Sequence, residues 1–425
     1  MRKDYQISGK NGSRELAKFL AANGQVILPM VELIEQSRMA VDELLEVLGR
    51  STLEAVLRIS AAGVAGEFHQ GKRGGRIVRH GHQEGVVSLE DRKMRISRPR
   101  LRKKGGGAGS DVGVPAYQAM QDDSRLSGKI WDTMMRGVST RNYAAILPSA
   151  CEAVGVSKSS ISREFVFASE EETKRLCERR FDDVDILIIY IDGIVFAEHN
   201  IIGAVGVDSE GHKHVLGIAE GATENSVVAT ALLESIAERG VASGVKRLFV
   251  IDGSKALRKA IDAVYGSANP VQRCRNHKVK NVLDHLPNEL RDQASSAMRA
   301  AFKLSEEDGM KRLETLASWL DREYPGAAAS LMEGLSEMFT INRLGLPASL
   351  RRSLATTNII ESPHSGVRMR TRRVSNWQGG SMVVRWAAPG FLATEKNFRR
   401  MMGYRDLWIL AAALGRNVDQ EGLAA

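Results

Sequence analysis

The sequence predicts an α/β domain with a mixed sheet, interrupted by an all-helical insertion and preceded by a mainly helical N-terminal region. Apolar, β-branched runs alternate with helical periodicity in residues 181–286, which is typical of an α/β domain. Residues 287–346 and residues 1–70 have helical periodicity without strand patterns. A chain of 425 residues also exceeds a usual single domain, so about two to four structural units are expected.

Residues 1–70 are predicted to form helices separated by glycines. Apolar residues recur there at intervals of three and four, and Ser51 and Glu54 have the spacing of a capping box. These helices suit a small bundle, a dimerisation surface or a DNA-binding region, and the sequence does not choose between them.

The positive charge of the chain is concentrated in residues 71–115. The formal net charge of the chain is +9, and residues 71–105 alone contain twelve Lys or Arg against three acids. Such a bias indicates contact with a polyanion such as DNA, although a solvated basic face is the alternative. The glycines predict a loosely packed arm that orders on DNA, with a short hairpin turning near Glu90 and Asp91. The expected DNA contacts of this arm are Arg100, Arg102, Lys103 and Lys104.

Residues 116–180 are predicted to be helical and to resemble a helix-turn-helix. A first helix would end near Gly155, and Ser157 would cap a short second helix that presents Lys158 and Arg163. An ordinary pair of helices around a glycine gives the same pattern, so DNA reading and simple packing are both open.

Two apolar runs in residues 181–286 each carry an aspartate followed by glycine: Asp192 in "ILIIYIDGIVF" and Asp252 in "RLFVIDGSKALRKAI". The predicted order of elements, βββαβαβα, matches a ribonuclease H-like domain. In such a sheet the first strand lies beside the fourth, so the two aspartates should face one another. Asp-Gly is also a common strand-ending turn, which could explain either aspartate alone.

Residues 347–425 are expected to complete the α/β domain after the helical insertion. Glu361 is the single acid in a stretch with six arginines, which are residues 351, 352, 368, 370, 372 and 373. Glu361 could be a third acidic site residue, it could serve a capping box opened by Asn358, or it could pair with a nearby arginine. Alternatively, Ser362 could cap a helix with Pro363 in its first position. The expected phosphate contacts here are Arg368, Arg370, Arg372 and Arg373.

Two close carboxylates repel unless a cation neutralises them, and Mg²⁺ prefers oxygen ligands. Asp192, Asp252 and Glu361 are therefore candidate ligands of two ions about 3.5–4 Å apart, the arrangement used for phosphoryl transfer. Magnesium is the expected cofactor, and manganese should substitute for it.

Cysteine and histidine spacing offers weaker signals. Cys274 and His277 have the spacing of half a zinc site, but no second pair is near, and His285 is the other close donor, so zinc is not favoured. Three cysteines cannot form a disulfide framework, and neither a signal peptide nor an apolar run of about 18 residues is found. A reducing cytosol, without membrane contact, is the expected location.

The chain resembles the Mutator-type transposases of bacterial insertion sequences over roughly Arg95 to Leu410. The matching stretches are "YIDG", "VIDGSKALRKAI", "QRCRNHKVKNVLDHLP", "TTNIIESPHSGVRMRTRRVSNWQGG" and "RWAAPGFLATEKNFRRMMGYRDLWIL". The resemblance implies that Asp192, Asp252 and Glu361 are the Asp-Asp-Glu metal ligands of the catalytic core. It also implies that Cys274 and His277 form the family's Cys-x-x-His motif, which is usually treated as supporting the active site and not as a zinc site.

The activity implied by the resemblance is magnesium-dependent cleavage at the terminal inverted repeats of the element. The exposed 3′-hydroxyl would then be joined to target DNA. A homodimer would hold two ends, and the protein would be associated with the nucleoid when bound to double-stranded DNA. Two alternatives are a ribonuclease H-like nuclease or resolvase without strand transfer, and a catalytically inactive DNA-binding regulator.

Overall fold

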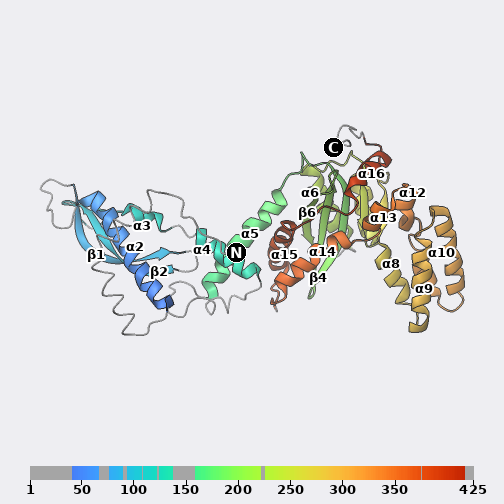
Figure 1. The fold of residues 1–425 in the computed structure, drawn as a ribbon, viewed down its shortest axis with the longest axis horizontal. Helices are drawn as coiled ribbons and strands as arrows, with labels where there is room; N and C mark the ends of the chain where they lie inside the picture. The colour runs from blue at the N-terminus through green and yellow to red at the C-terminus, as the bar shows by residue number, and fades with distance from the viewer. Residues whose placement is uncertain are drawn as a thin grey trace, which may run out of the picture. The chain divides into compact units, whose positions relative to one another are not determined.

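A computed structural model describes residues 41–66, 76–89, 93–107, 109–121, 124–136, 158–221, 225–374 and 376–416. The chain divides into two compact units (Figure 1). Unit 1 comprises Met1–Ile130 and Thr140–Ile161, and unit 2 comprises Trp131–Ser139 and Ser162–Ala425. The helices predicted in residues 1–40, and the first helix and turn of the predicted helix-turn-helix, lie outside the described residues. Its second helix belongs to α5 (Lys158–Glu178), which is much longer than predicted.

Unit 1 contains an antiparallel sheet in the order β1-β2-β3. Its elements are α2 (Val41–Ala65), β1 (Ile77–Ser88), β2 (Lys93–Lys103), β3 (Asp111–Val112), α3 (Pro115–Ala119) and, leading out of the unit, α4 (Ser124–Met135). Leu57 and Ala61 of α2 share a core with Met94, Ile96 and Leu101 of β2. The structure thus differs from the loosely packed arm predicted for residues 71–115.

The reason for this difference is visible in β2, where apolar and basic residues alternate. Met94, Ile96 and Leu101 are buried, while the basic residues between them are half-buried or exposed. Burial alternates with the two-residue period of a strand on either side of Ser97 and Arg98, where the phase of the alternation shifts by one residue. A count of charges over the segment conceals it. The predicted hairpin is confirmed, and its strands are longer than expected; residues 90–92 at its turn lie outside the described part.

Unit 2 is built on a five-stranded mixed sheet in the order β6-β5-β4-β7-β8. Its first elements are β4 (Ile186–Phe196), β5 (His199–Asp208), β6 (Lys213–Glu220), α6 (Ser226–Glu238), β7 (Leu248–Ile251), α7 (Lys255–Tyr265), β8 (Val271–Arg273) and α8 (Arg275–Leu283). The predicted order βββαβαβα is confirmed. The first strand, β4, pairs in parallel with the fourth, β7, as expected.

Both faces of this sheet are covered, which explains why β4 is apolar along its length. Ile189 and Ile191 pack with α6 and α7 on one face. Ile188 and Tyr190 pack on the other face with the C-terminal helices. Since side chains alternate along a strand, Asp192 belongs to the face of Ile188 and Tyr190. It therefore faces the C-terminal helices.

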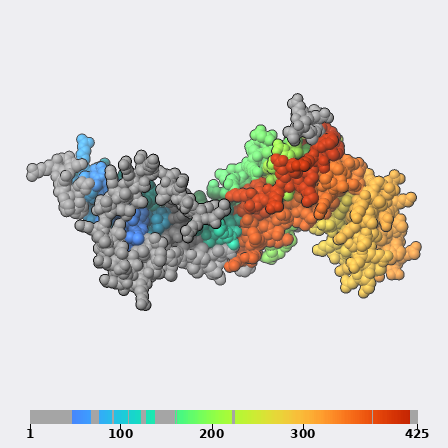
Figure 2. Space-filling model, viewed as in Figure 1, coloured from blue at the N-terminus to red at the C-terminus, as the bar shows by residue number. Residues whose placement is uncertain are grey.

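Helices follow the sheet over the segment predicted as an all-helical insertion, residues 287–346. They are α9 (Asn288–Ala301), α10 (Glu306–Leu320), α11 (Pro325–Met332), the 3₁₀ helix η2 (Ser336–Phe339) and α12 (Thr340–Arg343). Met298, Leu313, Leu331 and Phe339 belong to a core of their own, which α8 joins through Val282. Figure 2 shows this segment as a lobe of unit 2 in yellow and light orange.

The C-terminal helices return to the sheet. They are α13 (Ala348–Leu354), α14 (Asn358–Thr371), α15 (Gly380–Glu395), the 3₁₀ helix η3 (Tyr404–Asp406) and α16 (Leu407–Ala413). α14 begins at Asn358 with Thr357 as its N-cap residue, and Pro363 lies inside the helix. Neither capping arrangement considered for Glu361 therefore occurs. Among the described residues, no helix combines the length and the apolar character needed to cross a membrane.

Candidate active site

The strand register brings Asp192 and Asp252 together. Ile191 of β4 is paired with Ile251 of β7, and each aspartate is the next residue of its chain. The backbone N–H of Gly193 donates to Asp192 Oδ1 at 2.9 Å, and the N–H of Ser254 donates to Asp252 Oδ1 at 2.9 Å. Each carboxylate is therefore oriented by the backbone that follows it, which is still strand β4 after Asp192 and the loop after β7 in the case of Asp252.

The electrostatics of this pair disfavour two negative charges. Asp192 is 7% exposed. Burial, and then the negative charge of Asp252, raise the pKa of Asp192 to about 7, and Glu361 adds to this effect while His277 opposes it. Without a cation, Asp192 holds a proton over much of the range below neutrality. Carboxylate oxygens crowded in this way fit a hard divalent cation such as Mg²⁺.

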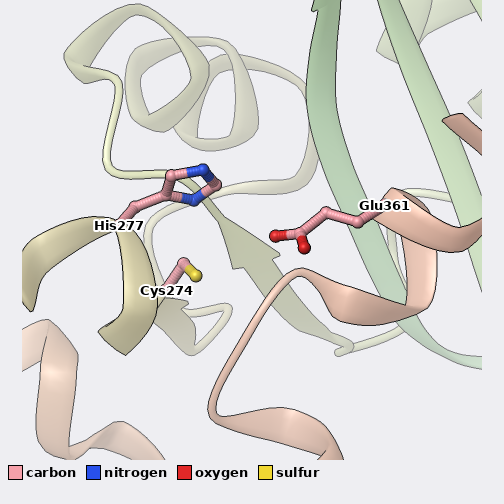
Figure 3. A group of neighbouring side chains, drawn as sticks. All are labelled: Cys274, His277 and Glu361. Atoms are coloured by element: carbon pink, nitrogen blue, oxygen red, sulfur yellow. The ribbon is translucent and has the colours of Figure 1, made fainter. Parts of the chain in front are cut away.

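Glu361 approaches the site from the first turn of α14, which packs against β4. The hydroxyl of Thr357 donates to Glu361 Oε1 at 2.9 Å. In Figure 3 the carboxylate points towards Cys274 and His277. One donor atom from each of these three residues lies within 4.8 Å of the others, and Glu361 does not form such a group of three with Asp192 and Asp252. The glutamate thus stands next to both the aspartate pair and the Cys-His pair.

Cys274 and His277 sit where β8 passes into α8. Cys274 is the N-cap residue of α8, and its N–H donates to the carbonyl of Ile251 at 2.7 Å, which ties it to the strand before Asp252. Thr357 links Glu361 to the Cys-His pair, because its N–H lies 3.4 Å from Cys274 Sγ. Its Oγ1 lies 3.4 Å from His277 Nδ1.

The Cys-His pair is polarised. Although burial raises the pKa of the Cys274 thiol, hydrogen bonds from His277 and Thr357 lower it below its ordinary value overall. The hydrogen bond with Cys274 raises the pKa of His277 to about 9, against the effect of burial, and both aspartates contribute. At neutral pH His277 therefore carries a positive charge beside the acidic residues.

Sequence reasoning missed two residues, Thr357 and His364. His364 is 3% exposed, and its Nδ1 lies 3.9 Å from Asp192 Oδ2. Its ring contacts Phe391 edge-on, and burial followed by the charge of Arg368 lowers its pKa to about 3, so the ring is neutral. Spacing was the available signal, since a residue three positions after Glu361 lies on the same helical face.

The predicted DNA contacts of unit 2 fall into two groups. Arg368, Arg372 and Arg373 are exposed at the end of α14, and Arg163 is exposed on α5. Arg370 instead donates to the carbonyl of Gly366 at 2.9 Å and to Thr394 Oγ1 at 3.2 Å. Its guanidinium is thus engaged within the protein.

The predicted contacts of unit 1 divide in the same way. Arg100 and Arg102 both bind the carboxylate of Asp111, at 2.9 and 2.8 Å. Lys103 and Lys104, at the end of β2, are exposed. Lys158 begins α5, and its side chain lies outside the described part of the structure.

Comparison with known proteins relates the chain to transposases. The model of the family described as "Transposase, Mutator family" matches residues 25–398. The transposase for insertion sequence element ISRM5 of Rhizobium meliloti (strain 1021) is 26% identical over 374 residues, covering 85% of this chain and 89% of that protein. The transposase for IST2 of Acidithiobacillus ferrooxidans is 29% identical over 200 residues, 47% of this chain and 65% of that protein. The transposase for IS6120 of Mycolicibacterium smegmatis is 26% identical over 246 residues, 56% of this chain and 74% of that protein.

Proposed function

Because the chain belongs to the Mutator family of transposases, we propose that it cleaves the ends of an insertion sequence and joins the exposed 3′-hydroxyl to target DNA. The observation that carries this proposal is the register of β4 and β7, which puts Asp192 beside Asp252 under the helix that bears Glu361. The order of elements and the parallel pairing of these strands support a ribonuclease H-like core.

In this proposal Asp192, Asp252 and Glu361 hold two divalent cations, Mg²⁺ or Mn²⁺. Such ions, when bound, activate the attacking oxygen and stabilise the leaving oxygen of a phosphoryl transfer. Asp192 must release its proton before it binds a cation, so we expect the affinity for Mg²⁺ to rise as the pH increases to about 7. The buried ring of His364 lies beside Asp192, and Phe391 packs against that ring.

The remaining residues of the site either orient the acidic side chains or bind the DNA. Thr357 orients the carboxylate of Glu361 through its hydroxyl. Arg368, Arg372 and Arg373 bind phosphates of the DNA on the C-terminal side of α14. A homodimer would bring two element ends together, as the joining of two ends to one target requires.

The test uses purified protein, Mg²⁺, a labelled duplex that spans an element end and its flanking DNA, and a second duplex as target. Asp192→Asn, Asp252→Asn and Glu361→Gln should each abolish cutting and joining while leaving DNA binding intact. Asp284→Asn is the matched control, because Asp284 is an exposed acid at the end of α8. This variant should act like the wild type.

The outcomes separate the three classes of function. Cutting and joining that depend on the three acids support a transposase. Cutting without joining would identify a nuclease or resolvase. DNA binding without cutting, in wild type and variants alike, would contradict the catalytic proposal and leave a DNA-binding regulator.

A further inference from the structure

Three side chains with different donor atoms converge beside the aspartate pair. Cys274, His277 and Glu361 offer sulfur, nitrogen and oxygen, and one such atom from each lies within 4.8 Å of the others (Figure 3). No other group of three His, Cys, Asp or Glu among the residues described in the structure meets this condition. Thiolate and imidazole ligands select Zn²⁺ and similar cations, whereas an all-carboxylate set suits Mg²⁺.

The hydroxyl of Thr357 contacts all three of these side chains. Its Oγ1 lies 2.9 Å from Glu361 Oε1, 3.4 Å from His277 Nδ1 and 3.5 Å from Cys274 Sγ. In a tetrahedral zinc site, bonds of 2.0–2.3 Å put neighbouring ligand atoms about 3.3–3.7 Å apart. The contacts of the Thr357 hydroxyl with His277 and Cys274 fall in this range, so the hydroxyl, or a water in its place, is available as the fourth ligand.

The backbone holds Cys274 in place. The N–H of Cys274 is bonded to Ile251 at 2.7 Å, and its carbonyl accepts from Lys278 at 3.1 Å. Cys274 is buried, while His277 and Glu361 are half-buried. The sulfur therefore lies at the bottom of the group, and an ion can reach it from the side of the other two ligands.

We propose that Cys274, His277 and Glu361 form a second cation site, which takes Zn²⁺ or another thiophilic divalent cation and shares Glu361 with the aspartate pair. This also revises the sequence interpretation that found only half a zinc site, because the third ligand comes from α14, more than eighty residues along the chain. A consequence that rests on the proposed function is that Zn²⁺ inhibits the transposase by drawing Glu361 away from the aspartates.

The binding test uses Co²⁺ as a spectroscopic probe of the full-length, metal-free protein. The wild type should bind one Co²⁺ with an absorption band for charge transfer from thiolate to cobalt, and equimolar Zn²⁺ should remove that band. Cys274→Ser should lose the band, and His277→Gln should weaken Co²⁺ binding at least tenfold. Circular dichroism verifies that both variants are folded.

Matched control variants show which cysteine supplies the sulfur ligand. Cys177→Ser should keep the band, because Cys177 is exposed on α5. Cys151→Ser should keep it as well. A wild type without a band, or a band that persists in Cys274→Ser, would overturn the proposed site.

The second measurement separates this site from the proposed activity. Asp252→Asn should bind Co²⁺ with the same band as the wild type although it is expected to be inactive. In the cleavage and joining assay with Mg²⁺, added Zn²⁺ should inhibit the wild type and the Cys177→Ser variant equally. A Co²⁺ band together with no cleavage under any condition would support the site and count against the transposase proposal alone.

Discussion

At the scale of the residue, Asp192 combines burial with a neighbouring negative charge. Burial and Asp252 raise its pKa to about 7, whereas an unfolded aspartate titrates near 4. A raised pKa in the folded state means that the folded protein holds more protons between these two values. Its contribution to stability is therefore fully present below pH about 4 and is lost as the pH rises to about 7.

The substitution Asp192→Asn tests this linkage in protein freed of metal by chelation. At pH 8 the variant should be more stable than the wild type by on the order of 2–4 kcal/mol, because the buried charge is removed. At pH 5 the difference should be much smaller. Urea unfolding followed by circular dichroism at both pH values measures it. Equal differences at pH 5 and pH 8 would show that Asp192 is not titrating in this range.

Thr357 is a positioning residue that sequence reasoning did not find. Thr357→Val keeps the shape of the side chain and removes the hydroxyl that donates to Glu361. Loss of a hydrogen-bond partner of a metal ligand typically costs about 10–100-fold in metal affinity or activity. We expect a decrease of that size in Mg²⁺-dependent joining for Thr357→Val. Thr357→Ser, which keeps a hydroxyl, should retain most of the activity. Equal activity of Val and wild type would contradict the positioning role.

At the scale of the element, the turn after β7 controls where Asp252 points. Gly253 has φ of +109°, a conformation that side chains rarely adopt, and an added Cβ would lie 3.0 Å from the Arg273 side chain. The turn therefore needs glycine both for its backbone and for the space beside it. The alternative that Asp-Gly marks the end of a strand applies to Asp252, which follows the end of β7, but not to Asp192, which lies within β4.

Gly253→Ala should lower the free energy of unfolding by about 1–3 kcal/mol, the usual cost of a strained backbone position. It should also weaken Mg²⁺ binding, because Asp252 moves with the turn. Gly244→Ala is the control, since nothing lies within 4 Å of its added Cβ and its φ is ordinary. That control should change stability by less than about 0.5 kcal/mol. Similar losses in both variants would refute the special role of the Gly253 turn.

At the scale of the whole molecule, fewer basic side chains are available to DNA than the number of Lys and Arg residues suggests. Asp111 neutralises part of the charge of Arg100 and Arg102, and these guanidinium groups hold the pKa of Asp111 at about 2. Arg370 is engaged by Gly366 and Thr394. The exposed Lys103 and Lys104 are better placed to meet phosphates.

The double substitution Lys103→Ala and Lys104→Ala should weaken DNA binding and make it less sensitive to salt. Each phosphate contact contributes about 0.9 to the slope of log K against log salt concentration, so the slope should fall by about 2. Fluorescence anisotropy at several salt concentrations measures it. Lys303→Ala with Lys311→Ala, two exposed lysines of the helical segment, is the charge-matched control and should leave the slope unchanged.

The prediction of the helices and strands rested on the local periodicity of apolar residues. The order βββαβαβα and the helical segment before Glu361 could be read from the sequence, because strands and helices impose repeats of 2 and 3.6 on their apolar residues. The place of Asp192 beside Asp252 also followed from the expected pairing of the first and fourth strands, and the register of β4 and β7 agrees with it. In β2 the same repeat was present, but the basic residues concealed it.

The sequence by itself therefore determined the elements, their order and the two strand-borne aspartates. Only the tertiary structure decided that Thr357 links Glu361 to Cys274 and His277, that His364 lies against Asp192, and which arginines are engaged internally. The physical reason is the separation of these residues along the chain. These contacts join residues of different elements, up to 172 positions apart for Asp192 and His364, and no local repeat encodes the packing of one element on another.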